Sequence, residues 1–380
     1  MKRLVCSMDG TWNDDISALP STNVAKLTRA VLPADTQGVK QLVRYVAGIP
    51  ASQEGSMSFK EAAGAVMGER IRAAYRFLSN TYEPGDEVYL FGFARGAYEA
   101  RSLASFIALF GVARRDADFD LDEAWRLYVK PDRKRDFNAV AELSGACHYP
   151  VRIRCTGLWD TVEYARTPRW PWSLLRRQKS RHDIRCHDIV DLALHALAID
   201  ETRGALRPIM FTLPHDVAMP AHCHVEQAWF SGTHADIGGI WSETGLSDIA
   251  LLWMAEKIQA ATGLALDMEQ LRRQSRADPL GPQHAPGSGW RDRLSRRLPY
   301  LRLVQQKTGS VPRGRRRLLG YLRTSKLPGG HVSLNEKIDE SAFARFGQTI
   351  REACGNRVEE RIYRPLALAA VLRDRETNEP

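Results

Sequence analysis

The residues best suited to chemistry lie at positions 88–97, where an apolar strand runs through Gly-Phe-Ala-Arg-Gly directly into a helix. The sharp turn of such a junction holds its central residue in a strained backbone conformation above a sheet. Glycines on either side allow the strand and the helix to approach closely. A serine at the centre of this nucleophile elbow attacks acyl groups. The residue here is Ala94, which has no oxygen to attack with.

Two explanations of Ala94 are open. Either the chain is a serine hydrolase whose nucleophile has been replaced, giving an inactive form, or the natural protein carries alanine and has lost catalysis. We favour the first explanation, because the other parts of the expected site are present.

Candidates for the two other catalytic groups follow the elbow in chain order. Asp160 ends an apolar strand, where a carboxylate can orient a histidine, and its alternative role is to cap the next turn. His234 lies in a Gly-rich loop after a late strand and suits the general base. His195 is a rival base, but it lies on an apolar-periodic segment, where we expect a satisfied helix histidine. Asp236 is the rival carboxylate, and its closeness to His234 in sequence favours bracing of the loop.

Asp9, Gly10 and Thr11 follow an early apolar strand. A Gly-containing turn there can supply one backbone N–H to an oxyanion hole, and the residue after the nucleophile supplies the other. Gly10, Thr11 and Arg95 are therefore the oxyanion candidates, with Asp9 in support, and a plain strand-end turn is the alternative. The segment also resembles the Asp-x-Asp-Gly-Thr signature of haloacid-dehalogenase-type phosphatases. The attacking aspartate of that signature falls on Ser7, so metal-dependent phosphatase chemistry through Asp9 is a weaker third hypothesis.

The pattern of elements predicts an α/β fold, because short apolar runs alternate with helical stretches as in a mainly parallel sheet covered by helices. Strands are predicted at Leu4–Met8, Leu42–Ala47, Glu87–Phe93, Val151–Leu158, Ile209–Leu213 and Glu226–Phe230. Helices are predicted at Lys60–Thr81, Gly96–Phe110, Asp122–Val129, His187–Thr202 and Ser247–Thr262.

The length of 380 residues accommodates one large α/β domain with insertions. We expect a core over residues 1–270 with a lid-like insertion at 164–186. A basic insertion rich in Pro, Gly and Arg is expected at 271–328, and a C-terminal part, 329–380, is expected to pack on the core.

Composition excludes several classes of protein. A hydrophobic fraction of 44% with 26% charged residues is that of a globular chain. No uncharged apolar run approaches the roughly 18 residues of a membrane span, and the apolar stretch near the start is too short for a signal peptide. The six cysteines contain no CxxC pair and no metal-like spacing, so we expect reduced thiols and no metal site formed by them.

The positive charge is confined to one segment. Residues 271–320 hold 12 arginines and one lysine against two aspartates, a balance of +11, whereas the whole chain carries +9 and the rest therefore sums to −2. This segment is expected to be a solvated loop or to bind an anionic partner, either lipid headgroups or an acidic protein face. Nucleic acid is not expected, because no binding motif accompanies the charge.

Six segments resemble, in the same order, the motifs of a bacterial α/β-hydrolase family that includes the type VI secretion phospholipase effectors of the first lipase class and uncharacterised relatives. They are MDGTWND, RYVAGIP, GFARGAYEAR, GLWDTV, HALAIDETR and EQAWFSGTHADIGG, and they cover residues 1 to about 255. The family elbow reads Gly-Phe-Ser-Arg-Gly-Ala, so Ala94 occupies the position of its serine. The family's acid and histidine fall on Asp160 and His234.

The resemblance implies an α/β-hydrolase-like fold and a serine ester hydrolase acting on lipids, of phospholipase type, inactive with Ala94 and needing no cofactor. The alternative is a catalytically silent protein of the same fold that binds lipid or a protein partner. Expected partners are a lipid or other ester, a membrane surface, and an immunity or secretion-apparatus protein. The resemblance also implies synthesis in the cytoplasm and export by a type VI system as a toxin.

One further segment bears on the substrate. Trp170, Trp172, Leu174 and Leu175 precede a cluster of basic residues. Aromatic and leucine side chains beside cations suit the boundary between lipid headgroups and acyl chains, so we expect a lid that meets the membrane. The alternative is an ordinary insertion that packs its tryptophans on the core.

Overall fold

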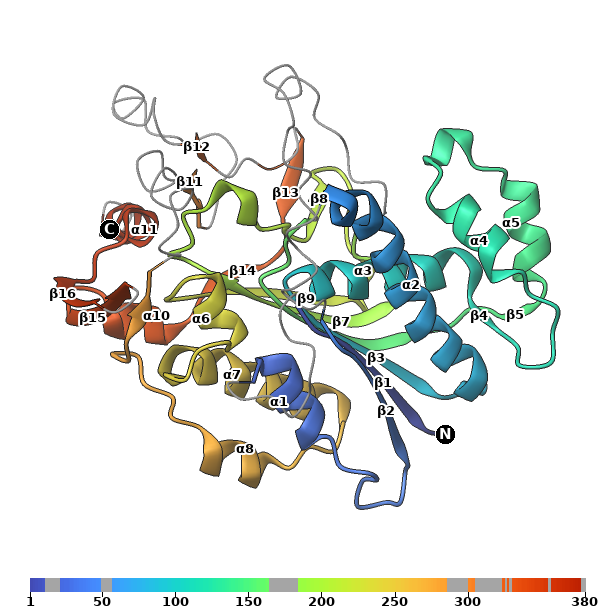
Figure 1. Cartoon of the computed structure of the whole chain (residues 1–380), viewed down its shortest axis with the longest axis horizontal. Helices are drawn as coiled ribbons and strands as arrows, with labels where there is room; N and C mark the ends of the chain where they lie inside the picture. Colours follow the sequence, from blue (N-terminus) through green and yellow to red (C-terminus); the bar gives the residue numbers. More distant parts are fainter. Residues whose placement is uncertain are drawn as a thin grey trace.

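A seven-stranded parallel sheet forms the centre of the computed structural model (Figure 1). The structure describes residues 1–10, 21–48, 57–163, 184–285, 300–304, 323–324, 327, 330–354 and 357–376. From one edge to the other, the strands are β14 (Glu336–Ile338), β9 (His224–Phe230), β7 (Val190–Ala198), β6 (Ile153–Trp159), β3 (Glu87–Phe93), β1 (Arg3–Met8) and β2 (Gln41–Val46). Every neighbouring pair in this order is parallel. The predicted α/β-hydrolase-like class, a mainly parallel sheet flanked by helices, is confirmed.

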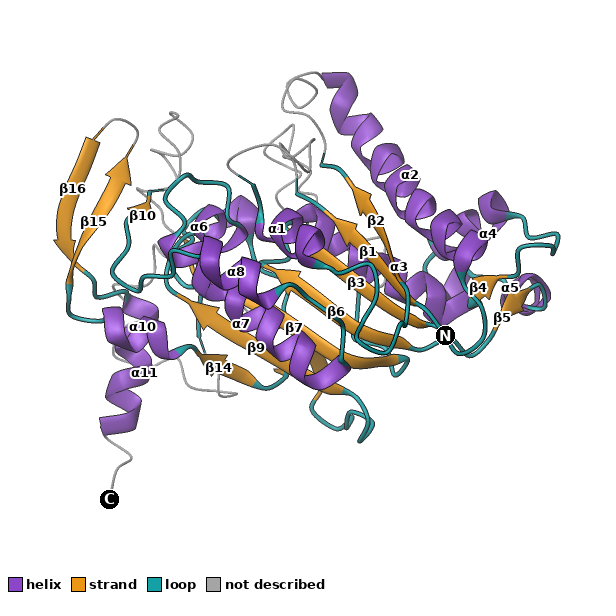
Figure 2. Ribbon diagram, turned by 90° about the horizontal axis from the view of Figure 1, so that it is seen from below, coloured by secondary structure: helices purple, strands orange, loops and turns teal. Residues whose placement is uncertain are grey.

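Helices cover both faces of the sheet, which is why its central strands are buried almost throughout. One face carries α2 (Met57–Thr81), α3 (Arg95–Phe110), α4 (Leu121–Tyr128) and α5 (Phe137–Ser144). The other face carries α1 (Asn23–Ala30), α7 (Gly245–Thr262) and α8 (Met268–Gln274), which Figure 2 shows in front of the sheet. Two separate hydrophobic clusters fill the two interfaces.

The C-terminal residues pack beyond the β14 edge, at the end of the molecule away from α4 and α5 (Figures 1 and 2). Their elements are α10 (Glu340–Arg345), a hairpin of β15 (Thr349–Cys354) and β16 (Arg357–Ile362), and α11 (Leu366–Glu376). A third hydrophobic cluster joins Tyr363 and Leu368 of this part to Trp229 of β9. The C-terminal residues therefore pack against the main sheet at its β14 edge.

Short strands connect the remaining described segments. They are β4 (Val112–Ala113) with β5 (Cys147–His148), β8 (Thr212–Pro214) with β13 (His331–Ser333), β10 (Gln283–His284) with β15, and β11 (Tyr300–Leu301) with β12 (Arg323–Thr324).

Two of the predicted elements are wrong. The helix expected at His187–Thr202 is the central strand β7, and the strand expected at Ile209–Leu213 is reduced to the three residues of β8. The β7 sequence is rich in Leu and Ala, which favour helices. In a parallel strand buried on both faces, however, the apolar run is nearly continuous, so its periodicity does not separate strand from helix.

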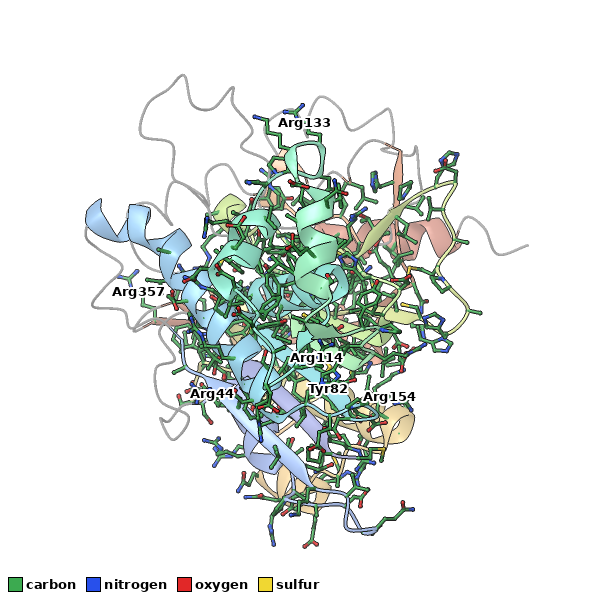
Figure 3. All side chains as sticks on the ribbon, turned by 90° about the vertical axis from the view of Figure 1, so that its right-hand side faces the viewer. Arg44, Tyr82, Arg114, Arg133, Arg154 and Arg357 are labelled. Carbon is green, nitrogen blue, oxygen red and sulfur yellow. The ribbon has the colours of Figure 1, made fainter. Side chains whose placement is uncertain are left out.

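Charge and thiols are distributed as follows. Figure 3 looks onto the end of the molecule that carries α4 and α5, and in this view Arg133 lies at the top, Arg44 at the lower left and Arg154 at the lower right. Of the basic segment 271–320, the structure describes only 271–285 and 300–304.

None of the six cysteines, all within the described residues, forms a disulfide. No described helix combines the length and apolarity that crossing a membrane requires.

The substitution Gly96→Ala tests the close approach of α3 to β1. A Cβ atom at Gly96 would collide with the backbone oxygen of Met8, so the helix would have to move off the strand. We expect the free energy of unfolding, measured by urea titration, to fall by about 3 kcal/mol or more. Gly204→Ala is the control, because its Cβ would meet Tyr300 Cβ at an ordinary 3.8 Å. An equal loss in both variants would contradict this account.

Candidate active site

The candidate residues gather at one edge of the sheet. Asp9, Ala94 and Asp160 follow the carboxyl ends of β1, β3 and β6, and Glu201 and His234 follow those of β7 and β9. The carboxyl ends of parallel strands meet at the same edge, which is where α/β sheets hold their ligands. Residues spread over more than 200 positions are thereby brought to one place.

Ala94 has the backbone of a nucleophile elbow. Its φ is 54° and its ψ is −118°, and it is one of only three described non-glycine residues with positive φ. Such a conformation costs of order 1–3 kcal/mol and persists only where the surroundings impose it. Here a Cβ at Gly92 would lie 2.6 Å from Ala97 Cα, and the Ala94 N–H donates to the carbonyl of Trp159 at 3.0 Å.

Asp160 and His234 are in direct contact. The Nδ1 atom of His234 lies 2.6 Å from Oδ2 of Asp160, which is fully buried. The imidazole stacks on Phe93, the residue before Ala94, with 4.8 Å between the ring centroids. Since Nδ1 is engaged by the carboxylate, Nε2 is the ring atom that can accept a proton. The arrangement is that of a general base oriented by an acid.

A third group, unforeseen from the sequence, reaches Asp160. The guanidinium of Arg302, from the residues just after β11, contacts Oδ1 at 2.6 Å and Oδ2 at 2.9 Å. Burial raises the pKa of Asp160, but the charge of Arg302 and the hydrogen bond from His234 outweigh it and hold this pKa well below its ordinary range. The carboxyl group is therefore ionised at neutral pH.

Hydrogen bonds among neighbouring side chains hold the loop that carries His234 in place. It leads into the short helix α6 (His234–Gly238), and Thr233 and Asp236 form a capping box at its start. Asp236 also contacts Nδ1 of His284 at 2.7 Å, and the His284 ring stacks on Trp241. Asp236 thus braces the loop, as the sequence predicted, but the histidine of β10 that completes the brace was not foreseen.

The turn after β1 is held by its own side chain. The carboxylate of Asp9 accepts hydrogen bonds from the hydroxyls of Thr22 and Tyr45 and from the Gly10 N–H, the last at 2.7 Å. Burial raises the pKa of Asp9, although these donors oppose the shift. The carbonyl of Asp9 accepts from Arg70 at 2.8 Å. Because the Gly10 N–H is already used by Asp9, that turn would have to open before this donor could serve an oxyanion.

The other oxyanion candidates differ in how well they are placed. Arg95 is the first residue of the 16-residue helix α3, whose N-terminal end favours negative charge beside position 94. Thr11 lies outside the described residues, as do Trp170, Trp172, Leu174 and Leu175.

His195 has a structural position. It lies on strand β7, and its Nε2 accepts a hydrogen bond from the backbone N–H of Thr161 at 3.0 Å. Burial lowers the pKa of His195 to about 3. It is thus a satisfied core histidine, though on a strand and not on the expected helix. Among the described residues, no cluster of three or more His, Cys, Asp or Glu side chains could hold a metal ion.

Comparisons with known proteins place this geometry in context. Residues 2–257 match the family model described as the type VI secretion phospholipase effector Tle1-like catalytic domain. An uncharacterised protein of Saccharomyces cerevisiae is 27% identical over 239 residues, which is 56% of this chain and 33% of the relative. The chain therefore spans about a third of that relative's length.

Two solved structures are similar at low identity. An uncharacterised protein from Pseudomonas aeruginosa is 17% identical, with a TM-score of 0.41 over 73% of this chain and 49% of the other. A Tle1 effector bound to the VgrG spike of a type VI secretion system is 16% identical, with a TM-score of 0.35 over 63% of this chain and 51% of the other. The chain thus spans about half of each.

The substitution Asp160→Asn tests the buried charges of the site. We expect it to lower the free energy of unfolding by about 3 kcal/mol or more at pH 7, because the guanidinium of Arg302 loses its buried counter-ion. The pKa of Asp160 is lowered by folding, so its contribution is complete above its unfolded pKa of about 4 and declines as the pH falls below that value.

The gap between parent and variant, both carrying His234→Gln so that no imidazole titrates beside position 160, is measured by urea unfolding. It should be constant from pH 5 to 7 and narrow below about pH 4. Asp191→Asn is the control, since its carboxylate pairs with partly exposed arginines and should cost less than about 1 kcal/mol. A gap that widens in acid would contradict the assignment.

Proposed function

Because the chain belongs to the family of Tle1-like phospholipase effectors of type VI secretion systems, we propose that its site is that of a serine hydrolase of lipid esters, with alanine at the nucleophile position. The observation that carries the proposal is the 2.6 Å contact of Asp160 with His234 beside the strained backbone of Ala94. A histidine oriented by a carboxylate contributes to catalysis at a nucleophile elbow only when the central residue of the elbow carries a proton that the ring can accept.

The reaction follows from this geometry once a serine stands at position 94. His234 Nε2 takes the hydroxyl proton as the serine oxygen bonds to the carbonyl carbon of the ester. The bond to the alcohol then breaks, and the alcohol leaves with the proton from the ring. Water, activated by the same nitrogen, cleaves the acyl-enzyme and restores the serine. The ionised Asp160 holds the ring and stabilises its cationic form.

The negative oxygen of each tetrahedral intermediate needs donors beside position 94. We propose the backbone N–H of Arg95, at the positive end of α3, as one donor. The second comes from Gly10 or Thr11, and for Gly10 this requires release of its hydrogen bond to Asp9. Phosphatase chemistry through Asp9 is not needed in this scheme.

Family membership also supports the wider setting of the proposal. Phospholipids at a membrane surface are the proposed substrates, and export by a type VI system is the proposed route to them. A protein of the secretion apparatus and an immunity protein are the proposed partners. Residues 164–183, which carry the proposed membrane-facing tryptophans, lie outside the described part of the chain.

Ala94 itself favours a second function. If alanine is the natural residue, the same fold serves as a silent binder of lipid or of a protein partner. The natural gene separates the two cases, since a serine codon at position 94 supports the enzyme and an alanine codon supports the binder.

The substitution Ala94→Ser is the direct test. We expect the variant to hydrolyse phospholipid or simpler acyl esters with kcat/KM at least about 1,000-fold above the parent chain, and to lose this gain when combined with His234→Ala. It should also be labelled at position 94 by a fluorophosphonate, which reacts with an activated serine.

Ala104→Ser is the matched control, because it places a serine at a buried alanine inside α3, away from the elbow, and should remain inactive. If folded Ala94→Ser shows neither label nor hydrolysis of any acyl ester, the enzyme proposal fails and vesicle binding by the parent chain becomes the test of the silent binder.

A further inference from the structure

Residues 300–304, here called the strap, lie in the basic segment 271–320, whose composition predicts either a solvated loop or a segment that binds an anionic partner. Tyr300, Arg302 and Val304 are buried, and the residues between them are partly exposed. The Tyr300 N–H donates to the carbonyl of Thr202 at 2.9 Å, and Val304 packs in the same hydrophobic cluster as Leu197 of β7. The strap is therefore seated across the carboxyl end of β7, beside the candidate site.

Arg302 points from the strap into the protein. Its side chain is fully buried, and it donates to Ala198 O at 2.9 Å and Leu206 O at 2.6 Å as well as to both oxygens of Asp160. A fork of two parallel bonds fixes both the position and the plane of a carboxylate. The Oδ2 atom thus accepts a hydrogen bond from Arg302 while it contacts Nδ1 of His234 at 2.6 Å.

We propose that Arg302 is a positioning residue of the active site, which orients Asp160 for His234 and lowers the proton affinity of the Asp160–His234 pair. The proposal deepens the proposed function and rests on it only for the consequence in catalysis. It assigns a role in the site to the strap, which lies beyond residues 2–257, the part that matches the family model.

The guanidinium of Arg302 changes how strongly the carboxylate of Asp160 favours a proton on the ring of His234. An unpaired buried carboxylate strongly favours the imidazolium it touches, because attraction between charges is large where water is excluded. A guanidinium on the same carboxylate offsets much of that attraction. The ring then remains neutral, and able to take a proton from a nucleophile, at lower pH.

Other charged and titratable groups near the pair are few among the described residues. Glu201 accepts the backbone N–H of His234 at 3.3 Å, and its own carboxylate is paired with Arg203. His195 lies behind Asp160 and is neutral, since burial lowers its pKa to about 3. Arg302 makes only a lesser contribution to the pKa of either group, since burial comes first for His195, and burial and then Arg203 for Glu201. The main change around His234 when Arg302 is replaced is therefore the loss of the guanidinium itself.

The experiment uses the full chain with Ala94 in place and follows the ring Cε1–H signal of His234 by NMR against pH. Loss of the signal in His234→Gln identifies it. In Arg302→Met, the midpoint of proton uptake should move to higher pH by about one unit or more. If Arg302→Met does not fold, Arg302→Gln serves as the neutral variant, with the same expected shift of the midpoint. Arg302→Lys, which keeps the charge, should move the midpoint by less than about half a unit.

Arg345→Met is the matched control. Arg345 is also fully buried and lies beyond the family match, but it donates to the carbonyls of Pro279 and Gly281, away from Asp160. It should lower thermal stability without moving the His234 midpoint. A midpoint that is unchanged, or lower, in a folded neutral variant of Arg302 overturns the proposal.

The two proposals fail separately. If the midpoint moves but Ala94→Ser is inactive, the coupling stands and the enzyme proposal fails. If Ala94→Ser is active and the midpoint does not move, only the role of Arg302 fails. Where both hold, the acid limb of the pH profile of kcat/KM in Ala94→Ser should shift upward with Arg302→Met by the same amount.

Discussion

The buried carboxylate of Asp160 is the constraint on which the site depends. A charge taken out of water is tolerated only when its oxygens are bonded, and here they receive Arg302, His234 and the backbone N–H of Ala198. These donors come from parts of the chain that are far apart in sequence. The carboxylate of Asp160 therefore connects the strap, the loop that carries His234 and the sheet. A displacement of any one of these partners alters the hydrogen bonds that Asp160 makes with the others.

The parts that follow local rules could be predicted from sequence. The strand Glu87–Phe93 has the predicted bounds, and α3 begins one residue before its predicted start, because glycine spacing and an apolar run mark that junction. The contact of Asp160 with His234 was expected from chain order, since acid and base both follow parallel strands and such strand ends meet at one edge.

What could not be predicted depends on long-range packing. Arg302 sits in a segment that composition describes only as basic, and nothing near it in sequence marks one arginine of 12 as buried. His284 meets Asp236 across 48 positions, again without a local signal. The sequence of β7 predicts a helix, because a strand covered on both faces loses the alternation of apolar and polar residues that identifies it.

The strained turn at Ala94 and the Asp160–His234 pair lie at the same edge of the sheet, and the proposed site requires the ring of His234 to face the Ala94 side chain. A crystal structure of the chain tests this most directly, through the distance from His234 Nε2 to Ala94 Cβ. A serine oxygen within hydrogen-bond reach of the ring implies a separation of about 4 Å. A ring turned away from Ala94, with a separation beyond about 6 Å, would contradict the account.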